Sequence, residues 1–433
     1  MRMKLFIAAL FVASLNLRPA ITSVSPLLET IRSELGMSGL AASLLTTLPV
    51  LCMGVFAPTA VRWIARWGTE RSLVLTMALI GAATLLRYFA GWPYVLHITS
   101  FLAGVGIAVA GPLLSGFIKK HFAGRSSAVI GFYSAALVIG AAVSSGLAVP
   151  LQEALGGSWQ ASLASWGWLA VAALPLWLWI ARRSAEPQAA ASSAEAAGLA
   201  TAAAGPAAKG AGSFAEASPA AKAASPAQAG ATANSARLPL RQPRAWLLTF
   251  FFGLVALIYY STTAWLAPAV EAIGYDRAAA GAVLTLFSFV QMPVSLVLPI
   301  LMQRYGNRLY WLLSFAACEL CGLLLLGMAG SPWAAAVLLG IGAGGLFPVA
   351  LLLPIEAAQS PDEAGAWSAM SQSGGYMISS LGPLFVGVLH DASDSFAQPL
   401  FGLAGLVVVM MLLIFGVGRN KKAGQVLAIG SRR

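Results

Sequence analysis

An arginine lies in the middle of the first long apolar stretch of this 433-residue chain, in the run Asn16-Leu17-Arg18-Pro19. A guanidinium group keeps its proton at any ordinary pH, so Arg18 carries a fixed positive charge into a segment of membrane-spanning length. Even on the mildest insertion scale, an arginine at the centre of such a helix costs about 2.5 to 3.5 kcal/mol. A cation in this position predicts a functional site, and its natural partner is an anion or a strong dipole. The alternative is a scaffold arginine that binds backbone carbonyls left free next to Pro19.

Polar and aromatic side chains in the apolar stretches are candidate partners for a small solute. Thr22 follows Arg18 by one helical turn and shares its face, whereas Asn16 points roughly 160° away unless Pro19 unwinds the turn. Gln372 and Tyr376 are four residues apart, so they can face the same way, and a glutamine amide both donates and accepts hydrogen bonds. Packing is the alternative role for this pair.

Chemistry of other kinds has little support in the sequence. A membrane-embedded enzyme would need paired carboxylates, a histidine cluster or a nucleophile with its base, but His97, His121 and His390 are far apart in sequence. The motif Cys318-x-x-Cys321 lies in an apolar stretch without further metal ligands, which favours packing. We therefore predict no catalytic residue, no metal and no cofactor.

The composition is typical of a polytopic membrane protein, with 59% hydrophobic and only 9% charged residues. The net charge of +11 does not indicate nucleic-acid binding, because all but four of the 26 Lys and Arg fall on one side of the expected topology. The exceptions are Arg18, Arg32, Arg87 and Arg277. This bias predicts that both termini are cytoplasmic. The first apolar run continues past Arg18 without a small-residue cleavage site, which argues against a cleaved signal peptide.

Twelve stretches have the length that a helix needs to cross the hydrocarbon. They lie near 5–26, 40–62, 72–91, 94–118, 126–150, 162–182, 245–270, 279–302, 309–329, 332–355, 365–389 and 397–418. Residues 184–243 are rich in Ala, Ser, Gly and Pro, which predicts a flexible cytoplasmic linker. The chain therefore divides into a six-helix bundle over 1–183, this linker, a second bundle over 244–419 and a basic cytoplasmic tail over 420–433.

The two halves repeat short motifs at equivalent spans. Gly104-x-Gly106-x5-Pro112 recurs as Gly340-x-Gly342-x5-Pro348, at an offset of 236 residues. Arg66-Trp67-Gly68 recurs as Arg304-Tyr305-Gly306, at an offset of 238. Together these matches predict two parallel repeats with a substrate site between them near the midplane. The glycines are expected to let helix backbones approach closely, and the prolines to bend their helices.

Several motifs resemble those of a known transporter family. The strongest are the run from Leu15 to Leu28 (LNLRPAITSVSPLL), Tyr259-Tyr260, Ala264-Trp265-Leu266-Ala267-Pro268, Gly344-Gly345-Leu346-Phe347-Pro348 and the run from Met370 to Tyr376 (MSQSGGY). With twelve expected spans, these residues resemble the major facilitator superfamily and, within it, the cyanate and nitroimidazole transporter family (the CynX/NimT type). The resemblance covers nearly the whole chain except 184–243. It implies the major facilitator fold, an all-α membrane protein of two pseudo-symmetric six-helix bundles.

The resemblance also implies a site and a function. In this fold the first, fourth, seventh and tenth spans line the cavity, which directs Arg18 inward as a positive anchor. The expected substrate-binding residues are Arg18, Thr22, Asn16, Tyr133, Tyr259, Tyr260, Trp265, Gln372 and Tyr376, although Trp265 is alternatively an interfacial anchor. The expected function is secondary transport of a small anion or small polar solute, cyanate-like, by alternating access, and the protein is not an enzyme. Nitroimidazole or drug transport is the alternative, and a non-transporting sensor is a remote one.

The expected partners and surroundings follow from the same argument. They are a small-molecule or small-anion substrate, the lipid bilayer and a proton as one candidate coupling ion, without nucleic acid, in a monomer in the bacterial cytoplasmic membrane. Two further charged residues lie in the apolar stretches. Arg87, near the outer end of its span, is expected to snorkel to headgroup water. Glu319 is expected to be protonated or packed against a helix.

Overall fold

The computed structural model describes residues 2–122, 126–183, 238–305, 307–358 and 361–418, which form helices with no β-strand among them. The N-terminal half contains α1 (Arg2–Asn16), α2 (Pro19–Thr22), η1 (Ser25–Leu27), α3 (Leu28–Leu35), α4 (Gly39–Phe56), η2 (Ala57–Thr59), α5 (Ala60–Trp67), α6 (Thr69–Leu86), η3 (Arg87–Phe89), α7 (Pro93–His121), α8 (Ser126–Ala154), α9 (Trp159–Ser165) and a helix over 168–183. The C-terminal half contains α11 (Pro243–Ala272), α12 (Arg277–Tyr305), α13 (Arg308–Gly327), α14 (Pro332–Ala357), α15 (Pro361–Ser379), α16 (Leu381–Ser393) and α17 (Ala397–Gly418).

Eleven helical segments of the described residues are long and apolar enough to cross a membrane. The predicted span at 365–389 is divided between α15 and α16 at Ser380. Pro383 has no N–H to donate to the carbonyl of Ser379, as an unbroken helix would require, which explains the interruption. The predicted all-helical membrane fold is thus confirmed, and this crossing is made of two shorter helices.

The linker predicted over 184–243 and the tail predicted over 420–433 lie almost entirely outside the described residues. Only the stretch that leads into α11 is described, and this helix already begins at Pro243. The division into two bundles with a flexible linker and a basic tail therefore stays a prediction.

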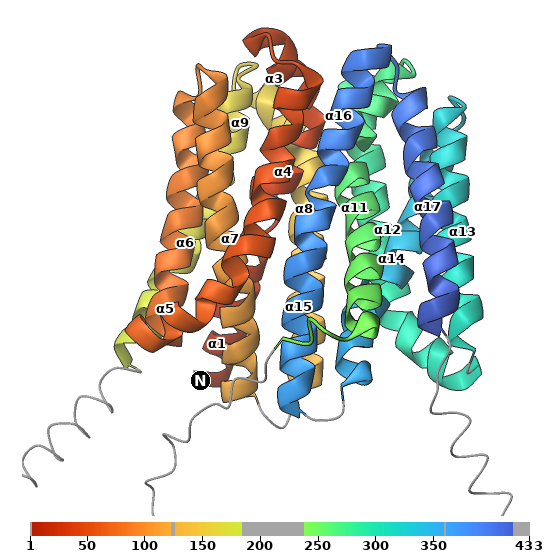
Figure 1. Cartoon of the computed structure of the whole chain (residues 1–433). Coiled ribbons are helices and arrows are strands. Elements are labelled where there is room, and N and C mark those ends of the chain that lie inside the picture. The colour runs from red at the N-terminus through yellow and green to blue at the C-terminus, as the bar shows by residue number, and fades with distance from the viewer. Residues whose placement is uncertain (1, 123–125, 184–237, 306, 359–360, 419–433) are drawn as a thin grey trace, which may run out of the picture.

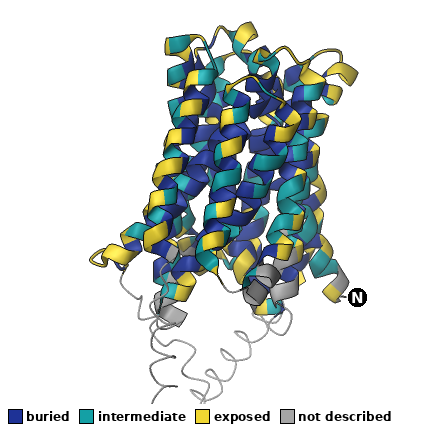
Figure 2. Cartoon of the chain, turned by 90° about the vertical axis from the view of Figure 1, so that its right-hand side faces the viewer, coloured by how far each residue is buried: buried dark blue, intermediate teal, exposed yellow. Residues whose placement is uncertain are grey.

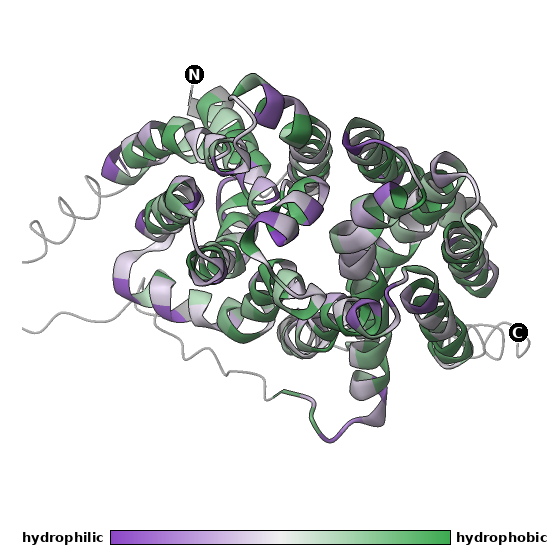
Figure 3. Cartoon of the chain, turned by 90° about the horizontal axis from the view of Figure 1, so that it is seen from above, coloured by the Kyte–Doolittle hydropathy of each residue, from purple (hydrophilic) through white to green (hydrophobic). Residues whose placement is uncertain are grey.

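Apolar side chains face outward along the helices, as a lipid environment requires. In α17, Leu412 is 65% exposed and Phe415 is 50% exposed, while Met410 and Ile414 on the other side of the helix are fully buried. Buried residues lie along the helix contacts and exposed ones on the outward faces (Figure 2). Viewed along the helices, most of the ribbon is coloured hydrophobic (Figure 3). Apolar residues therefore cover both the inward side of these helices, which contacts other helices, and the outward side, which suits contact with hydrocarbon.

The repeated glycines make equivalent contacts in the two halves. A Cβ atom at Gly104 of α7 would lie 2.5 Å from the Cα atom of Pro49 in α4, and one at Gly106 would lie 2.6 Å from Ile80 in α6. In α14, a Cβ at Gly340 would lie 2.8 Å from the Phe287 carbonyl of α12. The predicted close packing at these glycines is confirmed, and α7 and α14 occupy corresponding places in their halves.

Gly342 completes this correspondence and explains the environment of Glu319. A Cβ atom at Gly342 would overlap the side chain of Glu319 on α13, so α13 and α14 lie against each other there. Glu319 is only 1% exposed, and its Oε2 atom has no hydrogen-bond partner among the described residues. The expectation that Glu319 packs against a helix is confirmed.

We expect Gly140→Ala in α8 to lower the melting temperature of the purified protein by several degrees. The new Cβ atom would lie 2.6 Å from the carbonyl oxygen of Leu15 in α1, and overpacking of this kind typically costs roughly 1 to 3 kcal/mol. Gly405→Ala in α17 is the matched control, because a Cβ atom added there would have no other atom within 4 Å. Thermal unfolding in detergent checks both variants. Equal melting temperatures for the two would contradict this packing of α1 on α8.

Candidate functional site

The first span is interrupted at Arg18. α1 ends at Asn16 and α2 begins at Pro19, so Arg18 lies in the turn between them. Pro19 cannot donate to the Leu15 carbonyl, whereas the carbonyl of Arg18 accepts a hydrogen bond from the Thr22 N–H at 3.0 Å. Arg18 therefore extends from a break in the helix and not from a continuous helical face.

The guanidinium of Arg18 faces tyrosines from both halves of the protein. Its Cζ atom lies 5.8 Å from the ring centroid of Tyr259, and it interacts electrostatically with the adjacent Tyr260 in α11, whose hydroxyl donates to the sulfur of Met53 at 3.6 Å. Tyr376 of α15 and Tyr133 of α8 are also close enough to interact electrostatically with it. We call Arg18 and these four tyrosines the arginine–tyrosine cluster. It joins three helices of the two halves to the break in the first span.

Aromatic packing holds the cluster's rings in place. The ring centroids of Tyr259 and Tyr260 are 5.1 Å apart, and Tyr259 lies 5.2 Å from Phe347 of α14. The ring centroid of Phe252 lies 5.2 Å from that of Tyr376 and 5.7 Å from that of Phe347. Pairs of this geometry are each worth about 0.5 to 1.5 kcal/mol beyond the burial of their area. Three of the cluster's tyrosines thus belong to one aromatic wall together with Phe252 and Phe347.

The positive charge of the cluster has no carboxylate partner among the residues that the structure describes. None of the ion pairs formed by the described residues includes Arg18. Arg18, Tyr133 and Tyr376 keep some accessible surface, although Tyr260 beside them is only 1% exposed. A fixed cation ringed by hydroxyl groups, which can donate hydrogen bonds, is an arrangement suited to an anion or to an electron-rich polar group.

Gln372 extends the same surface by one helical turn. It precedes Tyr376 by four residues on α15, as the sequence predicted, and it is partly exposed. Within the described part of the chain, no hydrogen bond occupies its amide group. Gln372 can therefore offer both a donor and an acceptor to a solute at the cluster.

Two predicted site residues near Arg18 are turned away from the cluster. Thr22 is 2% exposed, and its hydroxyl binds the Arg18 carbonyl at 3.0 Å and Ser144 of α8 at 2.6 Å. Asn16 is 3% exposed and donates its amide to the sulfur of Met77 in α6 at 3.7 Å. Both side chains are buried and stabilise the surroundings of the break.

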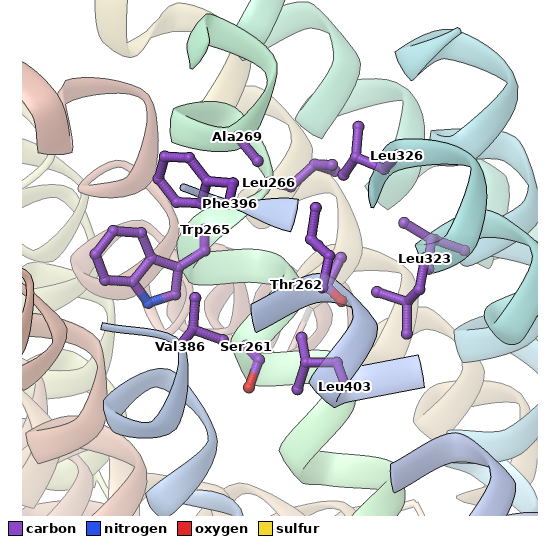
Figure 4. Close-up of a pocket in the computed structure, with 12 residues that line it drawn as sticks. Ser261, Thr262, Trp265, Leu266, Ala269, Leu323, Leu326, Val386, Phe396 and Leu403 are labelled. Carbon is purple, nitrogen blue, oxygen red and sulfur yellow. The ribbon is translucent and has the colours of Figure 1, made fainter. Parts of the chain in front are cut away.

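Trp265 lies away from the cluster, where α11 packs against α16. It is 2% exposed, and its indole N–H donates to the Pro383 carbonyl at 3.0 Å. It lines a small cavity of about 10 Å³ opposite Leu323 and Leu326 of α13 (Figure 4). This is at the lower limit for a single water molecule, so it is too small for a transported solute. Trp265 contributes to helix packing, neither to the cluster nor to an interfacial belt.

Arg87 is placed differently from its prediction. It is 0% exposed and does not reach headgroup water. Its two terminal nitrogens donate to the Ala20 carbonyl at 2.9 Å and to the Ser100 hydroxyl at 3.1 Å. The expectation of snorkelling is wrong because a carbonyl near the break in the first span is available to bind the guanidinium.

A group of contacts missed by the sequence reasoning joins the halves at the end of the molecule where α3 and α16 lie (Figure 1). The Asp391 carboxylate of α16 accepts hydrogen bonds from the N–H groups of Gly39 at 2.6 Å and Leu40 at 2.9 Å, at the start of α4. It also lies 3.9 Å from the guanidinium of Arg32. We call these four residues the Asp391 latch. In the sequence, Asp391 resembles any solvated residue at the end of a span.

Further hydrogen bonds join the two halves near this end. The Ser43 hydroxyl of α4 donates to the Pro383 carbonyl at 2.8 Å, and the Ser25 hydroxyl donates to the Ala264 carbonyl at 2.8 Å. Each bond connects the N-terminal half to the C-terminal half. The halves are therefore held together at the end of the molecule away from the N-terminus, where α3 and α16 lie (Figure 1).

Solved structures with the same fold are transporters. The chain superposes on a nucleoside transporter, NupG, with a TM-score of 0.70 at 10% sequence identity, covering 97% of this chain and 100% of that one. It superposes on a D-xylose-proton symporter with a TM-score of 0.68 at 12% identity, covering 97% and 98% of the two chains. At this level of identity, the comparison establishes the fold.

Relatives with higher sequence identity cover almost the whole chain. An uncharacterised transporter of Bacillus subtilis, YycB, is 32% identical over 96% of this chain and 94% of its own length. The 2-nitroimidazole transporter of Escherichia coli is 29% identical, over 96% of each chain. The cyanate transport protein CynX of the same organism is 31% identical over 94% of each. The resemblance to the cyanate and nitroimidazole transporters is thus confirmed.

A family model matches residues 6–359 and 267–428, and its description is Major Facilitator Superfamily. The matches together extend over both halves of the fold described above. This chain therefore belongs to the major facilitator superfamily and is a multi-pass membrane transporter.

Proposed function

We propose that this transporter carries a small anion or small polar solute, which binds at the arginine–tyrosine cluster. The observation that carries the proposal is the uncompensated charge of Arg18 at a break in the first span, facing tyrosines of the other half. Because an unpaired charge in a membrane interior is unfavourable, a bound anion relieves it by ion pairing and by hydrogen bonds from the guanidinium. The tyrosine hydroxyls and the Gln372 amide supply the remaining donors.

A cyanate-like anion fits this chemistry. Such an ion is small and singly charged, and it accepts hydrogen bonds at its ends, where Arg18 and Tyr376 would donate. The relationship to the cyanate transport protein of Escherichia coli supports the same substrate class. The solute would contact both halves at once, as a substrate must if its binding is to influence their rearrangement.

The aromatic wall favours nitroimidazole-like heterocycles as a second candidate. The rings of Tyr259 and Phe347 lie 5.2 Å apart and are inclined to each other, and a flat solute ring can stack on one of them. A nitro group is rich in electron density and accepts hydrogen bonds, so Arg18 can bind it as it would bind an anion. The relationship to the 2-nitroimidazole transporter supports this candidate.

Transport would proceed by alternating access in the bacterial cytoplasmic membrane. The excess of Lys and Arg on one side favours a cytoplasmic location for both termini, so the end joined by the Asp391 latch would face outward. Opening toward the outside would require the latch to separate.

Counterflow in proteoliposomes tests the proposed function. The purified protein is reconstituted with unlabelled cyanate or 2-nitroimidazole inside, and entry of the labelled compound is followed with and without a pH gradient. We expect exchange of at least one of the two solutes above the rate in protein-free liposomes. A dependence on the pH gradient would identify a coupled proton. Absence of exchange for both solutes would contradict the proposed substrate class.

We expect Tyr259→Leu to separate the two candidate substrates. Leucine keeps apolar volume but removes the ring, and a stacked ring is worth roughly 1 to 3 kcal/mol. The KM for 2-nitroimidazole should therefore rise about tenfold, whereas the KM for cyanate, which has no ring to stack, should change less than about threefold. Tyr275→Leu is the control, since Tyr275 is 39% exposed outside the cluster. Equal changes for both solutes would argue against stacking on Tyr259.

A further inference from the structure

The break in the first span leaves the backbone around Arg18 dependent on bonds from other helices. The regular helical ladder stops at Asn16, and the next pieces, α2 and η1, contain four and three residues. Short pieces of this kind have little stability of their own, because most of their peptide groups need partners outside the segment. The direction of the Arg18 side chain is therefore set by whatever holds residues 18–23.

One side of this segment is held by α8. The Thr22 hydroxyl connects the Arg18 carbonyl to Ser144 of α8, with distances of 3.0 and 2.6 Å. The Ser23 hydroxyl adds a local bond to the Pro19 carbonyl at 2.6 Å. The bond to Ser144 holds this segment against α8. The side of the segment that faces away from α8 needs another hydrogen-bond donor.

Arg87 holds the other side. One of its terminal nitrogens donates to the carbonyl of Ala20, two residues after Arg18, at 2.9 Å. The other donates to Ser100 of α7 at 3.1 Å, so one guanidinium connects η3, α2 and α7. Arg87 is 0% exposed and takes part in none of the ion pairs of the described residues, so its charge serves these two bonds alone. A planar fork can bind two acceptors on different helices at once, which an ammonium group does less well.

We propose that Arg87 is a positioning residue for substrate binding: it holds the Ala20 carbonyl so that the interrupted segment directs Arg18 at the tyrosines. It does not touch the solute. Its effect on affinity rests on the proposed function, because it acts through Arg18. Its effect on the backbone of residues 17–28 does not depend on any substrate.

Hydrogen exchange measures the backbone effect in the purified, substrate-free protein. We expect Arg87→Gln to speed exchange in peptides that cover residues 17–28, because the Ala20 carbonyl loses its charged donor. Arg87→Lys should give a smaller change, since it keeps the charge. Ser100→Ala is the matched control: it removes only the bond to α7 and should leave exchange in residues 17–28 close to that of the unmodified protein. Unchanged exchange in both Arg87 variants would overturn the proposal.

A double-mutant cycle measures the effect on binding. We expect Arg87→Gln to raise the KM for cyanate or 2-nitroimidazole about tenfold, and Arg87→Lys to restore part of the loss. In an Arg18→Gln background the same change at Arg87 should have no further effect on KM. A lower melting temperature with an unchanged KM, or additive effects of the two substitutions, would show a merely structural role. If the unmodified protein transports neither solute while exchange in residues 17–28 still responds to Arg87, the substrate class is wrong and the positioning of the break stands.

Discussion

Arg18→Gln is expected to lower the uptake efficiency of the reconstituted transporter by roughly a hundredfold or more. Glutamine retains a donor but removes the charge, and loss of one partner from a desolvated charged pair typically costs about 2 to 5 kcal/mol. The loss should appear mainly as a raised KM, because Arg18 is the only cation in the arginine–tyrosine cluster. Initial rates of cyanate and 2-nitroimidazole entry into proteoliposomes, measured over a range of concentrations, check this expectation.

Two further variants make the result interpretable. Arg18→Lys keeps the charge but loses the planar fork, so we expect a KM between those of the unmodified protein and Arg18→Gln. Arg277→Gln is the matched control, since it removes an arginine whose side chain is 50% exposed at the start of α12, distant in sequence from the cluster. A KM for both solutes that is unchanged by Arg18→Gln would exclude Arg18 as the anchor.

Asp391→Asn is expected to shift the protein toward a state that is open at the latch. The carboxylate accepts two backbone hydrogen bonds, at 2.6 and 2.9 Å, from the first turn of α4. An amide places a donor where one of those acceptors was, so at least one bond is lost. Hydrogen bonds to a charged group are worth about 1.5 to 3 kcal/mol, so the closed population should fall roughly tenfold or more relative to the open one.

Distances between spin labels on the two halves measure this shift. Suitable sites are Leu155 and Met328, which are 44% and 74% exposed and follow the ends of α8 and α13 on the latch side. The labels would be introduced as Leu155→Cys and Met328→Cys in a chain whose three native cysteines are replaced by serine. We expect the Asp391→Asn variant to show a population with a longer distance between the labels. This population should be minor in the labelled protein that retains Asp391.

Asp394→Asn provides the control for the latch. It removes the same charge three residues later, at a backbone φ of +49° that asparagine tolerates well. Its distance distribution should match that of the cysteine pair alone. If Asp394→Asn and Asp391→Asn widen the distribution equally, general electrostatics and not the latch would account for the closure.

The sequence predicted those features of the fold that depend on local composition. Twelve apolar stretches follow from hydropathy and length alone, and the glycine repeats correctly identified the close contacts of α7 and α14. The division of one crossing at Ser380 escaped prediction, although Pro383 was a visible reason for it. Apolar residues continue across that break, so a prediction based on hydrophobicity and length does not detect it.

The candidate site was predicted in part. The placement of Arg18 beside Tyr133, Tyr259, Tyr260 and Tyr376 agrees with the prediction, because charged and hydroxylated side chains are conspicuous in apolar spans. Thr22 is buried in bonds to its own backbone and to α8, which helical spacing does not reveal.

Arg87 and the Asp391 latch show a second limit of sequence reasoning. Arg87 binds a carbonyl 67 residues away, and Asp391 binds backbone N–H groups more than 350 residues away. Backbone partners carry no signature in the side-chain sequence, because every residue has the same carbonyl and nearly every one the same N–H. Only the packing of the helices determines which of these groups is left to be bound.

The unpaired charge of Arg18 has an electrical consequence. A monovalent anion at the cluster would neutralise it, so the loaded carrier would reorient without moving net charge, whereas the empty carrier would reorient with a cation at its centre. Moving one elementary charge through the full membrane voltage changes the energy by about 2.3 kcal/mol per 100 mV. An interior-negative voltage would then favour the inward-facing empty state and leave the loaded state nearly unaffected. Voltage would thus act on the return step of the cycle, setting how often an unoccupied site is presented to each side.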